Sequence, residues 1–218
     1  MRVACLFTIF YLLTCPGIKA QAFFNSVPVD TLRYRDIKGT PYMYPTWQTA
    51  RIVGRDSTVY ANVLLNYNAY NRSFDVKLAH RIVTLDNSLY DLITIYEDGA
   101  EKEWFIKGVH YDIANQLANV IYNGDKIKLI RSYNVKLAEI IDDLPGETLV
   151  RKKFYPVVSY FILYKSKLRQ IRLTKGRLAK VLEDKELVNK LAAQHHLEVG
   201  KETDAIALLR YFEESNPR

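Results

Sequence analysis

The sequence predicts an α+β protein, with a mainly antiparallel β-sheet or half-barrel of consecutive hairpins followed by two or three C-terminal helices. Tyrosine is abundant, at 16 residues, and Tyr-rich, β-branched chains favour strands. Turn sequences containing Gly, Asn and Asp recur between short apolar runs up to residue 173, which is typical of hairpins. Beyond residue 173 the apolar residues follow the spacing of amphipathic helices, and strands followed by helices indicate the α+β class.

The first twenty residues predict an export signal, residues 1–20. Arg2 supplies a positive start, residues 3–14 are uncharged and apolar, and small residues follow at Ala20 and Ala22. The apolar run is shorter than the roughly 20 residues that a membrane-spanning helix needs. We predict cleavage after Ala20, with cleavage after Ala22 as the alternative. The competing interpretation, a buried first element of a cytosolic domain, is disfavoured because the segment lacks the polar face that surface elements show.

Both cysteines, Cys5 and Cys15, lie inside the predicted signal. The sequence before Cys15 is similar to the bacterial lipoprotein processing box, so lipidation of Cys15 is a second hypothesis for this segment. The mature chain has no thiol, which excludes disulfides, thiolate zinc sites and cysteine nucleophiles. Its length is sufficient to bury a core without such cross-links.

The predicted β-rich domain, residues 21–173, begins with an extended lead-in at 22–38. The turn Gly39-Thr40-Pro41-Tyr42 enters the folded body, and Trp47 is expected to anchor it. The strands expected next are 48–53, 58–66, 73–78, 81–85, 89–96 and 101–106. Hairpin sequences connect the first pair at 54–57 and the last pair at 97–100, where Asp-Gly is a strong signal. The Asn-rich stretch 66–72 predicts another turn.

Two more hairpins complete the predicted domain. Strands 118–122 and 126–133 flank Asn123-Gly124-Asp125, and strands 154–164 and 168–173 flank Lys165-Ser166-Lys167. Between them, residues 135–142 form either a short helix or a ragged strand. The clearest internal turn, Asp143-Leu144-Pro145-Gly146, follows that stretch.

The C-terminal helical segment, residues 174–218, is expected to pack on the same domain. Thr174 and Asp184 are the expected N-caps of two short helices. A third helix at 202–214 places its apolar residues on one face, and its first turn carries acidic residues that the helix dipole favours.

This layout resembles uncharacterised exported β-rich proteins of Gram-negative bacteria. The similarity is carried by Gly39-Thr40-Pro41-Tyr42, by Trp47, by the stretch 63–70 (VLLNYNAY) and by Leu208, Leu209 and Tyr211 in the helical tail. It covers most of the mature chain. It implies a periplasmic or outer-membrane location and a β-rich fold, and it transfers no catalytic residue.

Known catalytic motifs are absent from the mature sequence, which has no G-x-S-x-G elbow, H-E-x-x-H pair, P-loop or G-x-G-x-x-G fingerprint. Enzyme activity therefore stays undecided, with the balance against it. His110 and Asp112 would share one face of an extended segment, as a base and its orienting carboxylate do, although an exposed loop that contains a His and an Asp is the favoured explanation.

Other titratable clusters have simple structural explanations. Adjacent His195 and His196 could join Glu198 at a metal, but neighbouring helical residues point about 100° apart and chelate poorly. The pairs Glu97-Asp98 and Asp142-Asp143 could serve a glycosidase, yet acidic residues are common beside turns. We expect no metal and no cofactor.

The strongest non-random feature is a basic stretch without any Asp or Glu, from residue 151 to residue 180, interleaved with aromatic residues. Its cations are the candidate anion-binding residues Arg151, Lys152, Lys153, Lys165, Lys167, Arg169, Arg172, Lys175, Arg177 and Lys180. In an exported chain we expect an anionic lipid or lipopolysaccharide surface or an acidic glycan rather than nucleic acid. The alternative is a solvated face balanced by nearby acids. Removing Arg2 and Lys19 from the net charge of +7 leaves +5 for the mature chain.

Tyr67, Asn68 and Tyr70 are the candidate ligand-binding loop residues, because tyrosine rings and asparagine amides are common in sugar and peptide sites. Ordinary turn chemistry is the alternative. The sequence as a whole predicts an exported, non-catalytic binding module of the cell envelope, with no transmembrane segment in the mature chain. Its partner would be an envelope protein, a glycan or an anionic lipid surface. An envelope hydrolase assembled from distant residues is the competing hypothesis.

Overall fold

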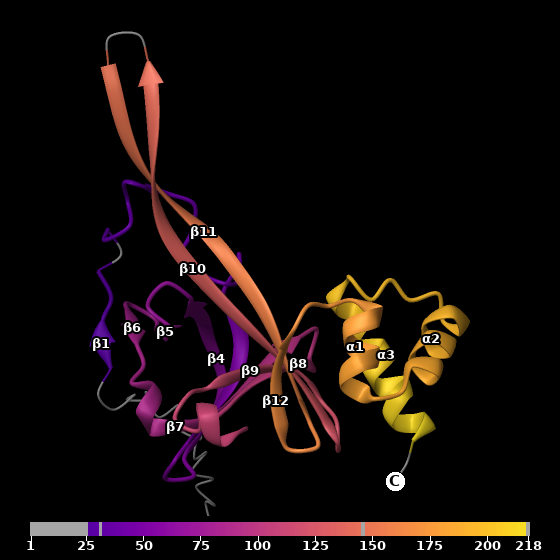
Figure 1. Ribbon diagram of the computed structural model, residues 1–218. Coiled ribbons are helices and arrows are strands. Elements are labelled where there is room, and N and C mark those ends of the chain that lie inside the picture. The colour runs from indigo at the N-terminus through magenta and orange to yellow at the C-terminus, as the bar shows by residue number, and fades with distance from the viewer. Residues whose placement is uncertain (1–25, 31, 145–146, 217–218) are drawn as a thin grey trace, which may run out of the picture.

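The computed structural model describes residues 26–30, 32–144 and 147–216, which form a β-rich α+β fold with three C-terminal helices (Figure 1). This confirms the predicted fold class, as a mostly antiparallel open sheet. The predicted export signal, Cys15 and the Pro145-Gly146 turn lie outside the described residues. No helix in the described part of the chain is long and apolar enough to cross a membrane.

Twelve strands join one sheet in the order β1-β6-β5-β4-β3-β7-β8-β9-β10-β11-β12, with β2 pairing β11. Their bounds are β1 (Val27–Pro28), β2 (Ile37–Lys38), β3 (Gln48–Gly54), β4 (Val59–Asn68), β5 (Ser73–Lys77), β6 (Ile82–Thr84), β7 (Tyr90–Glu97), β8 (Ala100–Ile106), β9 (Ala118–Asn123), β10 (Ile127–Leu144), β11 (Glu147–Tyr164) and β12 (Lys167–Ile171). The pairing of β2 with β11 is parallel, and the other described pairs are antiparallel. The strands mostly follow the chain from one hairpin to the next, as the turn sequences predicted.

Two stretches differ from the sequence-based expectation. The strand β4 continues to Asn68, so the turn shortens to residues 69–72. Buried Asn66 explains the difference, because its side-chain amide exchanges hydrogen bonds with the backbone of Tyr44 instead of shaping a turn. The undecided stretch 135–142 is strand, because β10 runs in continuous register with β11 from Ile127↔Tyr164 to Leu144↔Glu147.

The sheet carries two main core clusters, one on each half. Its first half packs around Ile52, Ile93 and Phe105, all at most 1% exposed. Its second half is covered by α1 (Lys175–Leu182), α2 (Lys185–Gln194) and α3 (Glu202–Ser215), whose apolar residues pack on β9 to β12. The helices thus pack on one half of the sheet, and the core beneath them is a cluster distinct from that of the first half.

The helices begin and attach as the sequence chemistry indicates. Thr174 and Asp184 accept hydrogen bonds from backbone N–H groups three residues on, at 3.4 Å and 2.9 Å, as N-caps do. On α3, the Glu213 carboxylate accepts from Tyr122 Oη at 2.8 Å and from the backbone N–H of Ile127 at 2.6 Å. This last contact fastens α3 to the β9–β10 turn.

The lead-in carries β1, which pairs with β6, and β2, which pairs with β11, and two further contacts hold its C-terminal part and the turn that follows. Asp75, fully buried on β5, accepts hydrogen bonds from Arg33 Nη2 at 3.2 Å and from Tyr42 Oη at 2.8 Å. Gly39 has a φ of +91°, and a Cβ there would lie 3.0 Å from the carbonyl oxygen of Phe154. Only glycine meets both conditions without strain, so the predicted entry turn also lets the lead-in approach β11.

Candidate binding site: the β10–β11 arm and the cavity at its base

The hairpin of β10 and β11 projects from the body as a two-stranded arm (Figure 1). The register of β9 with β10 ends at the pair Arg131↔Asn119, and that of β11 with β12 ends at Tyr160↔Ile171. Arg131 and Tyr160 are themselves partners. The arm therefore begins after this one pair and includes residues 132–144 and 147–159, which extend roughly 40 Å at about 3.3 Å per residue.

A network of charged side chains clamps the pair at the base of the arm. Arg131 Nη1 donates to Glu202 Oε1 at 2.9 Å, and Tyr160 Oη donates to Glu202 Oε2 at 3.1 Å, so the first residue of α3 binds both strands. Burial and the Glu202 carboxylate raise the pKa of Tyr160 to about 12. The hydroxyl is therefore a donor at neutral pH.

The same arginine neutralises a buried carboxylate. Glu103, on β8, is 2% exposed and accepts hydrogen bonds from Tyr44 Oη at 2.8 Å, from Asn119 Nδ2 at 2.7 Å and from Arg131 Nη2. Arg131 Nε also donates to Asn119 Oδ1 at 2.9 Å. Burial and the Glu103 charge raise the pKa of the Tyr44 hydroxyl far above its ordinary value. Each carboxylate oxygen of Glu103 is thereby satisfied, as a buried charge requires.

The inner face of the arm packs on the body near its base. Phe154, 3% exposed, lies edge-on to Tyr34 with ring centroids 5.3 Å apart and against Tyr70 at 5.2 Å. Val135 N–H donates to the carbonyl of Ala69 at 3.3 Å. These contacts support only the lower part of the arm, so its outer part is an isolated two-stranded ribbon.

The outer face of the arm is cationic. Register places Lys136 opposite Tyr155 and Lys38, on β2, beside Lys153, with Arg151 two residues further along the same face. Residues of the arm alternate between faces, so Glu139 falls on the opposite, inner face. The outer face therefore combines several cations with the ring of Tyr155.

Exposed apolar side chains are also concentrated on the arm. Ile141 and Val150, directly opposite each other, are 63% and 57% exposed. Ile140, Tyr155 and Val158 are at least 38% exposed. Contiguous exposed apolar surface is uncommon on a protein without partners and marks interaction sites. A two-stranded ribbon is also marginally stable in water on its own.

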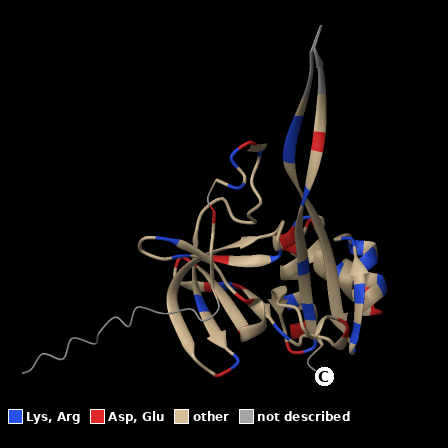
Figure 2. Ribbon diagram, turned by 90° about the vertical axis from the view of Figure 1, so that its left-hand side faces the viewer, with Lys and Arg blue, Asp and Glu red and all other residues tan. Residues whose placement is uncertain are grey.

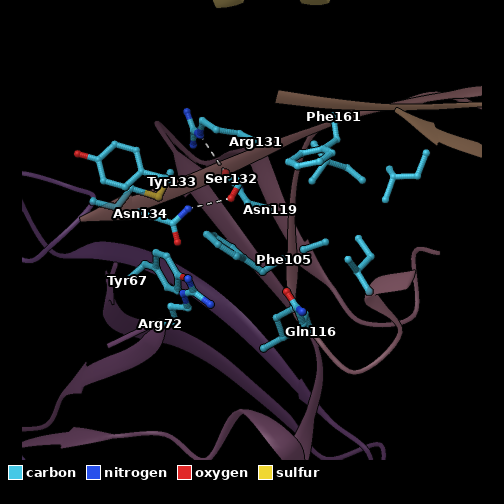
Figure 3. A pocket seen from close by; sticks show the side chains of 16 residues that line it. Tyr67, Arg72, Phe105, Gln116, Asn119, Arg131, Ser132, Tyr133, Asn134 and Phe161 are labelled. Carbon is cyan, nitrogen blue, oxygen red and sulfur yellow. Dashed lines mark hydrogen bonds between the residues drawn. The ribbon is translucent and has the colours of Figure 1, made fainter. Parts of the chain in front are cut away.

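A cavity of about 220 Å³ opens beside the base of the arm, where β10 leaves β9 (Figure 3). Phe105, Met43 and Leu117 contribute apolar surface to its wall. Polar side chains come from separate parts of the chain and are Arg72, Gln116, Asn119, Arg131, Ser132 and Asn134. An apolar pocket with a few convergent polar groups is the usual form of a small-molecule site.

Comparisons with protein-family models, with curated proteins and with solved structures give no match for this chain.

The basic stretch that the sequence singles out does not form one surface. Arg151, Lys152 and Lys153 lie on the arm, whereas the other seven cations lie near β12 and α1 (Figure 2). The strand from Lys153 to Tyr164 alone measures roughly 35 Å. In the second group, Lys165 pairs with Glu183 at 2.7 Å on the surface. Acids outside the stretch thus balance part of this charge.

The three loop candidates have different surroundings. Tyr67 lines the cavity and packs on Phe105, with ring centroids 5.4 Å apart. Asn68 is fully buried, and its Oδ1 accepts from the backbone N–H of Asn71 at 3.1 Å, which shapes the turn. Tyr70 is 40% exposed and lies against Phe154. Only Tyr67 therefore faces a cavity.

The histidine and acid pairs contribute no assembled catalytic or metal site in the described residues. His110 is buried, its Nδ1 lies 3.4 Å from Asp112 Oδ2, and Nδ1 also accepts from the Asp112 backbone N–H. His195 stacks on Tyr211 with ring centroids 3.8 Å apart, and the described residues contain no group of three or more side chains that could hold a metal ion. Glu97 pairs with Lys102 across its hairpin at 2.7 Å.

Arg131 and Glu103 organise the site, and neither is among the residues predicted from the sequence. A signal for Glu103 is present, since strand alternation puts it on the same face as Phe105, the buried face of β8. A carboxylate on a buried face needs a paired cation. That pairing partner is far along the chain, and only the order of strands brings it near.

Proposed function

We propose that this protein is an exported, non-catalytic binding module, and that the β10–β11 arm engages an acidic surface of a partner protein. The observation that carries the proposal is the composition of the arm. Exposed Ile140 and Tyr155 lie among the cations Lys38, Lys136 and Lys153 on one face of the arm. Interface centres are enriched in aromatic residues, and complementary charge around them steers association.

An arm is suited to this role because its strands bury little of their own surface. Along residues 136–144 and 147–151, β10 and β11 pair with each other and with no other described strand, so both edges of this ribbon are available to a partner. Unpaired strand edges offer backbone donors and acceptors to another chain. The exposed apolar side chains gain a buried environment only when a partner covers them.

A photo-crosslinking experiment tests this function in the organism that makes the protein. A benzophenone amino acid replaces Tyr155 on the arm or, as a control, Leu64 on β4, whose exposures of 39% and 41% are matched. We expect a discrete protein adduct from position 155 and none from position 64. Reversing the arm charges with Lys136→Glu and Lys153→Glu should remove that adduct.

Flotation with vesicles containing anionic phospholipid distinguishes the other class of partner. The proposal expects no flotation of the purified chain at physiological salt. Flotation that Lys136→Glu and Lys153→Glu abolish, without a protein adduct at position 155, would replace the protein partner with an anionic lipid surface. Equal adducts from positions 155 and 64 would remove the arm from the interaction altogether.

A further inference from the structure

The cavity at the base of the arm has a cation that no described acid neutralises. Arg131, on one side, contacts two carboxylates, Glu103 and Glu202. Arg72, on the other side, forms no ion pair or side-chain hydrogen bond with a described residue, although it lines the cavity. Its guanidinium therefore keeps five N–H donors and a full charge for a ligand.

The backbone fixes Arg72 at the rim. Its φ is +58°, a left-handed conformation in which glycine or asparagine is less strained. The Asn87 Nδ2 donates to the carbonyl of Arg72 at 2.9 Å, and the side chain of Asn68 closes the same turn. The turn thus places a long cationic side chain beside the cavity at some conformational cost.

Neighbouring groups add further donors. The Tyr67 hydroxyl and the side-chain amide of Gln116 line the cavity and have no hydrogen-bond partner among the described residues (Figure 3). Burial raises the pKa of the Tyr67 hydroxyl, and the charge of nearby Arg72 opposes that rise. The hydroxyl stays protonated at neutral pH and can donate. Donors around one uncompensated cation suit an anionic acceptor.

The remaining wall limits the size and character of the ligand. Phe105, Met43 and Leu117 present apolar surface. The volume of about 220 Å³ is below the roughly 300–1,000 Å³ of sites for drug-sized molecules. The space is thus suited to one ring or a short aliphatic group.

We propose that this cavity binds a small organic carboxylate, with its carboxylate on Arg72 and its apolar body against Phe105 and Met43. The site is separate from the outer face of the arm. It would give the protein a small-molecule ligand in addition to its macromolecular partner. Each proposal can therefore fail without the other.

Met43 provides a local reporter, because the sequence has only 2 methionines, Met1 and Met43. The purified chain, labelled with 13C at its methionine methyl groups, is titrated with three probes that share a phenyl ring. They are phenylacetate, the neutral amide phenylacetamide and the cation phenethylamine. We expect a saturable shift of the Met43 methyl signal with phenylacetate, a weaker response to the amide and none to the amine.

Variants assign the carboxylate contact. Arg72→Gln should weaken phenylacetate binding by about tenfold or more, as expected for a charge-assisted hydrogen bond, and Arg72→Lys should weaken it less. Arg81→Gln, the same change at an exposed turn arginine, should leave the affinity unchanged. Equal responses to all three probes, or unaltered affinity in Arg72→Gln, would overturn the proposal. The probe ranking in the unmodified chain remains decisive if Arg72→Gln fails to fold.

Discussion

Replacing Arg131 with leucine tests whether the charged network at the base of the arm stabilises the fold. The Arg131 side chain is 15% exposed and the Glu103 side chain 3%. Arg131→Leu therefore leaves a buried carboxylate without its cation and without access to water. Breaking a buried ion pair in this way costs about 3–5 kcal/mol. Because whole domains are stable by only about 5–15 kcal/mol, the expected loss is a large fraction of the total.

Urea unfolding followed by far-UV circular dichroism measures this loss. At a typical slope of about 2–3 kcal/mol per molar urea, the midpoint should fall by more than about 1 M. Arg55→Leu is the matched control, because Arg55 is 65% exposed and lies 3.8 Å from Asp91. Such a surface pair contributes no more than about 1 kcal/mol.

A second variant separates the energetic cost of the unpaired Glu103 charge from the cost of lost packing at residue 131. Adding Glu103→Gln to Arg131→Leu removes the uncompensated charge and keeps an acceptor for the Tyr44 hydroxyl. In this variant the Asn119 Oδ1 no longer accepts a hydrogen bond from Arg131 Nε. The Asn119 side-chain amide can therefore rotate so that Oδ1 accepts from the Nε2 of the new glutamine. We expect the double variant to recover a substantial part of the stability. If Arg131→Leu lowers the free energy of unfolding no more than Arg55→Leu does, the network does not stabilise the fold. The same holds if the double variant is less stable than Arg131→Leu.

Two further predictions concern the helical layer and alkaline pH. Glu213→Ala should destabilise the protein by about 2–3 kcal/mol, because buried Ile127 N–H loses its acceptor. The matched change at the exposed neighbour, Glu214→Ala, should alter the free energy of unfolding by about 0.5 kcal/mol or less, and equal effects would contradict the contact. The pKa of Tyr160, about 12 in the folded protein, exceeds the unfolded value of about 10, so its stabilising contribution is complete below pH 10 and is lost as the pH rises toward 12. Tyr160→Phe should therefore lose less stability than the parent chain between pH 10 and pH 12, and an identical loss would argue against the assignment.

Local signals account for the parts of the fold that the sequence predicted well. Turn sequences such as Glu97-Asp98-Gly99-Ala100 determine hairpins over a few residues, and β7 and β8 begin and end within one residue of the expected positions. The N-caps Thr174 and Asp184 likewise act within one helical turn. Such features depend on neighbours in the chain, which a single sequence displays.

The arm escaped prediction because its strands lack the usual burial pattern. A strand covered on one face alternates apolar and polar residues, but residues 136–141 (KLAEII) place Lys136 on the outer face and Glu139 on the inner face. Both faces are partly exposed, so the alternation disappears. The turn predicted to begin at Asn66 was placed too early. Asparagine is typical of turns, but here Asn66 is buried in a strand and exchanges hydrogen bonds with the Tyr44 backbone.

The cavity was predictable only in part, because its lining is assembled by strand order. Tyr67 was selected for its residue type, but Arg72, Phe105 and Arg131 meet only when β4, β8 and β10 take their places in the sheet. Charge density in the sequence also proved a poor guide to charge density in space. The basic stretch divides between the arm and the α1 region, whereas the outer-face cations Lys38 and Lys153 are distant in sequence and adjacent in the sheet.

The position of Glu202 explains how so long an arm can have a defined direction. The sheet supports β10 and β11 from both sides only as far as the pair of Arg131 and Tyr160. At that pair the first residue of α3 binds Arg131 on one strand and Tyr160 on the other, where the helix dipole favours a carboxylate. Apolar contacts are not directional, whereas these hydrogen bonds are, and they orient both strands relative to the helical layer. The helices therefore have a structural role at the arm as well as in the core, because they fix the base from which it projects.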